Sequence, residues 1–301
     1  MRALFVFTPA ESKRLIGKAV ANLEEVNKAK IEEQILIGHG STNVYVAEEV
    51  LGRKKSAVLM NRNAYLSGVI TRGTLCCTQG EDKPPIIILN RGVPIPPAPT
   101  MSEMLRDFGR DSIVVKGANA VDPEGNAGVF VAHPEGGTIG WSIGAIIARG
   151  IRLIVPVGLE KLIPSLKKAT EFCGQQTYDY CQGLRVGIIP LSGAKVVTEI
   201  DALKILSGVD SVHVASGGNT GSEGSVTLVS EGDPKAIEKA IQLFESIKGE
   251  PPMRIRKRIC ETCYPTTHPV EPKGYSVKYR GIRCQFERKK EPEIPEYLRS
   301  P

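Results

Sequence analysis

Apolar residues three and four positions apart predict a helix near the start of the chain. The stretch Thr8–Glu11 has the form of a capping box with proline at the first helical position, and apolar residues continue at helical spacing through Val26. The run Ile35–Ile37 then predicts a strand, which breaks at residues 38–43 before Val44–Leu51 resumes as a helix. A strand, a glycine loop and a helix start thus follow one another.

Short apolar runs rich in β-branched residues recur further along the chain. They are Ser56–Met60, Pro85–Leu89, Ser112–Lys116 and Arg152–Val157, separated by glycine or by helical stretches. Strands that alternate with helices are typical of a parallel sheet. Residues 1–182 are therefore predicted to form an α/β domain with a doubly wound, mostly parallel sheet.

The order of elements changes after residue 182. The pattern predicts strand Leu184–Leu191, helix Thr198–Leu206, strands Ser211–Ala215 and Ser225–Ser230, and helix Pro234–Ile247. This βαββα order is that of a small α+β domain of ferredoxin-like type that lacks one strand. We assign it to residues 183–250 and expect the missing strand from the tail, residues 251–301, for example at Tyr275–Tyr279.

The glycine loop has the chemistry of an anion site. Gly38 and Gly40 let the backbone turn sharply, so that its N–H groups, the hydroxyls of Ser41 and Thr42 and the start of the next helix can converge on a phosphate or a carboxylate. Asn43 completes this stretch. Alternatively, the loop is a well-capped turn without a ligand.

His39 lies between the two glycines and is the histidine best placed for acid/base chemistry or for contact with an anion. Its alternative role is that of a spacer between two necessary glycines. The sequence leaves both roles open.

Composition predicts a soluble cytoplasmic protein. The chain has 301 residues, of which 41% are apolar, and no apolar run approaches the length of a membrane span. Its seven cysteines do not form the pattern of a disulfide scaffold, which favours a reducing compartment.

The net charge of +6 comes from the tail. Residues 251–301 hold 12 Lys/Arg against 6 Asp/Glu, and the rest of the chain balances 27 against 27. The densest runs, Arg254–Arg258 and Arg288–Lys290, suit an acidic partner, a nucleic acid or simply a solvated surface. Nucleic-acid binding is the less favoured of these, because no aromatic-rich binding module accompanies the charges.

Two further segments give the chain a family resemblance. Lys116–Asn126 reads KGANAVDPEGN, and Glu135–Gly140 reads EGGTIG shortly downstream. With the glycine loop, in this order and spacing, they resemble the superfamily of ribose-5-phosphate isomerases, glucosamine-6-phosphate deaminases and CoA-transferases. Lys116–Asn126 and Leu153–Ile163 also resemble its lactate-utilisation branch. The similarity covers about residues 9–165.

The resemblance implies a ligand at the carboxyl ends of the strands, namely a small phosphorylated or CoA-linked metabolite. The candidate binding residues are Gly38, His39, Gly40, Ser41, Thr42, Asn43, Lys116, Gly117, Asn119, Asp122, Gly136 and Gly137. The isomerase mechanism does not carry over, because Asn119 and Gly144 stand where that family has proton-transferring carboxylates. A homo-oligomer is an open alternative to a monomer.

A CoA-transferase would need a glutamate nucleophile beside glycines, with CoA as its cofactor. Glu135 before Gly136 and Glu124 before Gly125 have that neighbourhood, and both are alternatively exposed turn residues. The functional hypotheses are therefore an enzyme or binding protein for such a metabolite, a non-catalytic sensor or assembly protein, and, third, RNA binding through the tail.

The tail also contains a metal-like cluster. Cys260-x-x-Cys263, His268 and Cys284 offer four ligands of the kinds that zinc takes, although their spacing matches no familiar zinc module. Buried or idle thiols are the alternative. Between a structural zinc and addition of a tail strand to the small domain's sheet, the sequence favours the strand.

Overall fold

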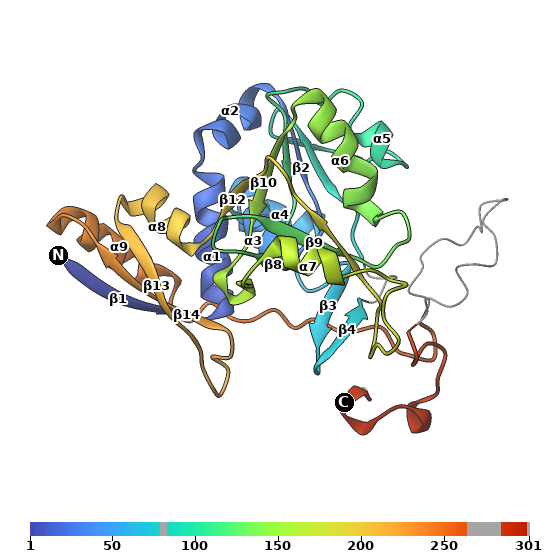
Figure 1. Cartoon of the computed structure of the whole chain (residues 1–301). Coiled ribbons are helices and arrows are strands. Elements are labelled where there is room, and N and C mark those ends of the chain that lie inside the picture. Colours follow the sequence, from blue (N-terminus) through green and yellow to red (C-terminus); the bar gives the residue numbers. More distant parts are fainter. Residues whose placement is uncertain (79–82, 264–283, 300–301) are drawn as a thin grey trace.

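The computed structural model describes residues 1–78, 83–263 and 284–299, and its centre is a six-stranded sheet (Figure 1). In spatial order the strands are β12 (Lys195–Val197), β10 (Arg152–Pro156), β7 (Ile113–Val115), β2 (Gln34–Ile37), β5 (Ile87–Asn90) and β6 (Val93–Ile95). The first four are parallel, and β5 and β6 continue the sheet in antiparallel fashion. The predicted α/β class is confirmed, with a mixed sheet in which three of the five strand pairings are parallel.

Alternate residues of the strands supply two separate cores. Ile35 and Ile37 face a core shared with α1 (Pro9–Ala21) and α3 (Ser41–Leu51), whereas Leu36 faces a second core. The second core includes side chains of α5 (Met101–Met104) and α6 (Gly137–Arg149). Strands that are covered on both faces have apolar residues at consecutive positions, which explains the short continuous apolar runs in the sequence.

The expected capping box opens α1: the Glu11 N–H donates to the Thr8 hydroxyl, and the Thr8 N–H donates to the Glu11 carboxylate. Helix α2 (Glu24–Glu32) then leads into β2. The strand predicted at Ser56–Met60 is wrong, because residues Arg53–Leu59 form helix α4. Only Ser56 of α4 is buried and Val58 is exposed, whereas Met60 just after the helix joins the first core. The length of so short an apolar run could not distinguish a strand from a helix.

A second sheet of three antiparallel strands has the order β1 (Arg2–Phe7), β14 (Ser225–Glu231) and β13 (Asp210–Gly217). Helices α8 (Glu199–Ser207) and α9 (Pro234–Ile247) confirm the two predicted helices. The third strand comes from the start of the chain. The suggested tail strand Tyr275–Tyr279 lies outside the described residues.

Two contacts explain why β1 joins this sheet. The rings of Phe5 and Phe7 lie 5.0 and 5.3 Å from that of Phe244 on α9.

The sequence prediction that the strand at residues 184–191 belongs to the small domain's sheet is wrong. Strand β11 (Gly187–Pro190) pairs instead with β9 (Ala127–Val131), which also pairs with β8 (Ala120–Val121).

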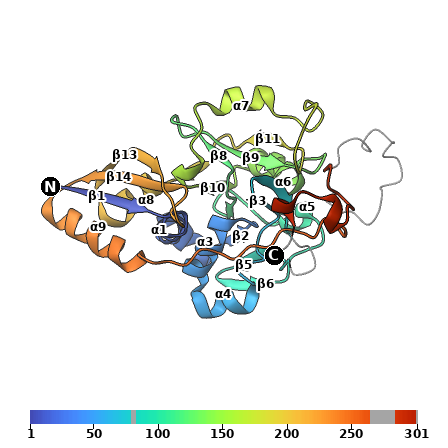
Figure 2. The same ribbon diagram turned by 90° about the horizontal axis from the view of Figure 1, so that it is seen from below.

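The remaining elements are short. They are the hairpin of β3 (Gly68–Thr71) and β4 (Thr74–Cys77), helix α7 (Leu166–Phe172), and the 3₁₀ turns η1 (Leu159–Lys161), η3 (Glu291–Glu293) and η4 (Glu296–Leu298). After α9 the chain runs past the main sheet to the β3–β4 hairpin, as Figures 1 and 2 show. No helix within the described residues is both long and apolar enough to cross a membrane.

Candidate anion site at the carboxyl edge of the sheet

The glycine loop leaves the carboxyl end of β2 and is held on both sides by backbone hydrogen bonds. The Gly38 N–H donates to Val115 O at 2.9 Å, and the Gly40 N–H donates to Tyr65 O at 3.0 Å. These two loop N–H groups are therefore engaged by the protein itself. Helix α3 begins directly afterwards at Ser41, and no side chain caps its N-terminus. The positive end of its dipole thus stays available at the edge of the sheet.

Asn43 joins this loop to the loop after β7. Its Nδ2 donates to Gly38 O at 2.8 Å, and its Oδ1 is buried without a hydrogen-bond partner in the described residues. A Cβ built on Gly117 would lie 3.4 Å from that Oδ1, so the two loops are in contact. Thr42 is buried with Asn43, whereas Ser41 is half-buried.

Two lysines follow neighbouring parallel strands at the same edge. Lys116 follows β7 and its Nζ donates to Gly117 O at 3.1 Å, while Lys161 follows β10 and its Nζ donates to Ala118 O at 3.1 Å. Both side chains are half-buried. The Lys116 side chain passes the glycine loop, because a Cβ on Gly38 would lie 3.3 Å from the Lys116 Cδ.

The surroundings make the positive charge of these lysines costly. Burial, followed by the charges of Lys161 and Lys83, lowers the pKa of Lys116 to about 8. Burial, followed by the charge of Lys13, lowers the pKa of Lys161 to about 8. Burial also lowers the pKa of Lys83. Several cations therefore share one poorly solvated region.

Carboxylates at this edge only partly balance the cations. Glu160 Oε1 lies 2.6 Å from Lys13 Nζ and 4.0 Å from Lys161 Nζ, so two lysines share one carboxylate. Glu199 follows β12 and accepts a hydrogen bond from the Leu159 N–H at 2.9 Å, and burial raises its pKa. The local excess of positive charge is what an anion would neutralise.

His39 is a neutral anchor of the loop in this structure. Its Nε2 lies 2.8 Å from Pro84 O, and its ring centroid is 4.6 Å from that of Tyr65. Burial and the nearby charge of Lys83 lower its pKa to about 3. His39 therefore lacks, at neutral pH, the positive charge that would hold an anion.

Other predicted binding residues hold the neighbouring loops together. The Oδ1 of Asn119 accepts from the Phe130 N–H at 3.0 Å, and Asp122 accepts from the Leu166 N–H at 2.9 Å. Gly136 and Gly137 have positive φ angles and open α6. The structure thus brings Lys116 and Gly117 to the glycine loop and shows structural hydrogen bonds for Asn119 and Asp122.

The two candidate nucleophiles lie in turns. Glu135 accepts a hydrogen bond from the indole N–H of Trp141 at 3.0 Å, and its own N–H donates to His133. Glu124 is exposed in the turn that ends at Gly125. These contacts show that local turn structure positions both glutamates.

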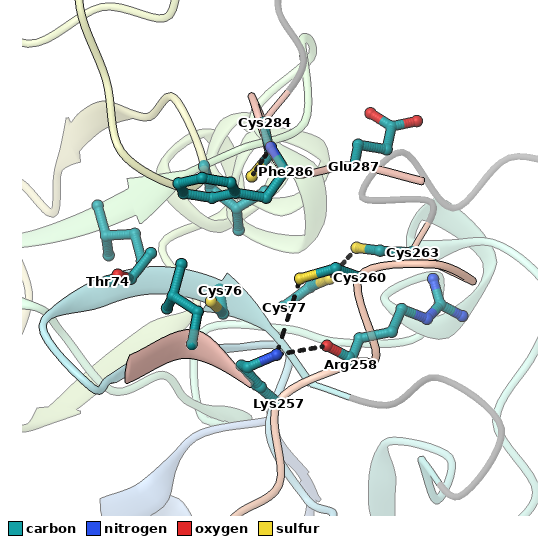
Figure 3. Close-up of a pocket in the computed structure, with 13 residues that line it drawn as sticks. Thr74, Cys76, Cys77, Lys257, Arg258, Cys260, Cys263, Cys284, Phe286 and Glu287 are labelled. Atoms are coloured by element: carbon teal, nitrogen blue, oxygen red, sulfur yellow. Dashed lines mark hydrogen bonds between the residues drawn. The ribbon is translucent and has the colours of Figure 1, made fainter. Parts of the chain in front are cut away.

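The tail cysteines lie away from this edge. Cys260, Cys263 and Cys284 line a pocket together with Cys77 of β4, as Figure 3 shows, while His268 lies outside the described residues. The tail reaches β4 by pairing: Lys257 forms a bridge with Thr78, and the Arg258 N–H donates to Cys77 O at 3.0 Å.

Sequence reasoning missed Lys161 and Cys77. Lys161 could have been found, because it follows a predicted strand just as Lys116 does, and parallel strands end at the same edge. Cys77 carried no such signal, since it lies far along the chain from the other cysteines of its pocket.

A scan against protein-family models found no match, and searches of the curated proteins and of the solved structures found none. The superfamily resemblance therefore stays a prediction, and the geometry above has to carry the function.

Proposed function

We propose that the chain binds a small phosphorylated or CoA-linked metabolite at the carboxyl edge of its parallel strands. The observation that carries this proposal is the pair Lys116 and Lys161, whose half-buried ammonium groups donate to backbone carbonyls. The Lys116 side chain also passes the loop that leads into the uncapped N-terminus of α3. A bound phosphate would offset their desolvation and accept from α3.

The position of the site supports the same proposal. In α/β sheets, ligands bind outside the carboxyl ends of the strands, and here β2, β7 and β10 all end at the cationic cluster. A doubly wound topology and a ferredoxin-like small domain belong to this proposal as the finer architecture. The non-catalytic sensor remains the alternative, because His39 is held neutral and Glu135 is bonded to Trp141.

Calorimetric titration with inorganic phosphate, pyrophosphate and CoA tests the proposal. We expect at least one probe to bind, and Lys116→Met and Lys161→Met each to weaken it about tenfold or more, because a hydrogen bond to a charged group contributes about 1.5–3 kcal/mol. Lys239→Met on the exposed face of α9 is the matched control and should bind as the parent does. Failure of all three probes, or equal binding by the lysine variants, would contradict the proposal.

A further inference from the structure

Four thiols from three separate parts of the chain meet beside the β3–β4 hairpin. Cys77 ends β4, Cys260 and Cys263 follow α9 at C-x-x-C spacing, and Cys284 begins the last described segment. All four line one pocket, and Cys76 of β4 lines it as well (Figure 3). None of the four forms a disulfide in this structure.

The spacing of Cys77 and Cys263 suits a shared metal. Cys77 Sγ and Cys263 Sγ lie 3.5 Å apart. Two thiolates on a tetrahedral zinc, each about 2.3 Å from it, are separated by about 3.8 Å. Within the described residues no three such side chains are yet arranged around one point, so binding requires rotation of cysteine side chains about χ1.

The charges around the pocket suit thiolates. Lys257 Nζ lies 3.7 Å from Cys260 Sγ, and Arg258 lines the same pocket, against one carboxylate, that of Glu287. A zinc ion with four thiolates carries two negative charges, which the neighbouring cations offset. The Phe286 N–H also donates to Cys284 Sγ at 3.5 Å, as backbone groups do around bound thiolates.

The apolar core of the tail is too small to stabilise its fold. Its apolar cluster contains three buried side chains, those of Phe286, Ile294 and Leu298, with Cys260 and Cys284 packed against them. Segments of this size usually need a metal or a disulfide for a stable fold. A metal would therefore strengthen the join that the Lys257–Thr78 bridge and the Arg258–Cys77 hydrogen bond make between the tail and the hairpin.

We propose that Cys77, Cys260, Cys263 and Cys284 bind one zinc ion that fastens the tail to the β3–β4 hairpin. Cys77 takes the fourth position, for which the sequence alone had suggested His268. Each thiol gives up its proton to solvent when it binds, and no redox step is involved.

Zinc analysis of the purified full chain tests the site. We expect one zinc per chain, and its loss in Cys77→Ser and Cys263→Ser. Cys173→Ser is the matched control, because this cysteine does not line the pocket, and the variant should retain zinc. Circular dichroism of each variant checks that the main domain still folds.

A second experiment tests whether Cys77 or His268 is the fourth ligand. His268→Ala should keep the metal, and cobalt substituted for zinc should show the thiolate absorption of four sulfurs, which falls in Cys77→Ser. Several results would overturn the proposal: metal-free protein from zinc-replete medium, zinc loss in Cys173→Ser or His268→Ala, an iron–sulfur chromophore with acid-labile sulfide, or a Cys77–Cys263 disulfide in metal-free protein.

Discussion

At the scale of single residues, the cost of charge burial is concentrated in the lysines of the sheet edge. Lys116 donates to a backbone carbonyl and lies close enough to Lys161 and Lys83 to feel their repulsion. Such a residue lowers the stability of the unliganded fold, and an anion that binds beside it restores favourable electrostatic energy. Strain of this kind is typical of functional sites.

The pH dependence of stability should reveal this cost. Folding lowers the pKa of Lys116 from its ordinary 10.5 to about 8, so between these values the unfolded chain holds more protons and stability rises with pH. We expect Lys116→Met to be more stable than the parent at pH 7 by about 1–3 kcal/mol, with the difference shrinking towards pH 10. Urea unfolding at pH 7 and pH 10 measures this difference in the free energy of unfolding. A difference that is the same at both pH values would contradict the lowered pKa of Lys116.

At the scale of elements, the packing of α1 on α3 depends on one small residue. A Cβ on Gly17 would lie 2.9 Å from the carbonyl carbon and the Cβ of Tyr45, closer than real contacts allow. Glycine here lets the two helices approach closely at Tyr45, about one turn after the start of α3. The position of the anion site thus depends on a helix crossing.

Gly17→Ala should separate α1 and α3. Overpacking costs about 1–3 kcal/mol and outweighs the gain in helix propensity of about 1 kcal/mol. Gly144→Ala in α6 is the control, because nothing lies within 4 Å of its added Cβ, and it should stabilise the protein by about 0.5–1 kcal/mol. Thermal unfolding compares the melting temperatures of both variants with that of the parent. Equal shifts in the two variants would contradict the close approach of α1 and α3.

At the scale of the whole molecule, one buried arginine connects distant parts of the chain. Arg14 of α1 is 1% exposed and forms ion pairs with Glu48 and Glu49 of α3 and with Glu250, which follows α9. Arg62 pairs with Glu48 and Glu250 as well. The network therefore fixes the start of the tail against the main domain.

Arg14→Met should leave the carboxylates of Glu48 and Glu250 without their main buried partner, which costs about 3–5 kcal/mol of unfolding free energy. Arg2→Met is the matched control: its pair with Glu231 is largely exposed, so its loss should cost less than about 1 kcal/mol. Chemical denaturation of both variants measures the two costs. A small loss for Arg14→Met would show that the network is not a main support.

Local signals located many elements well. The capping box at Thr8, the apolar run of β2 and the helical patterns of α8 and α9 all depend on neighbouring residues, so the sequence predicts them directly. The run at Ser56–Met60 failed because a short apolar stretch fits either a strand or a helix until its burial is known.

The sequence by itself determined the alternation of strands and helices, the glycine loop and the order of the candidate motifs, because these depend on neighbouring residues. Tertiary structure decided the rest. It placed β1 beside β14, brought Lys161 to Lys116, and set Cys77 against Cys263, since each of these pairings closes a long loop and depends on burial and charge that no local pattern encodes.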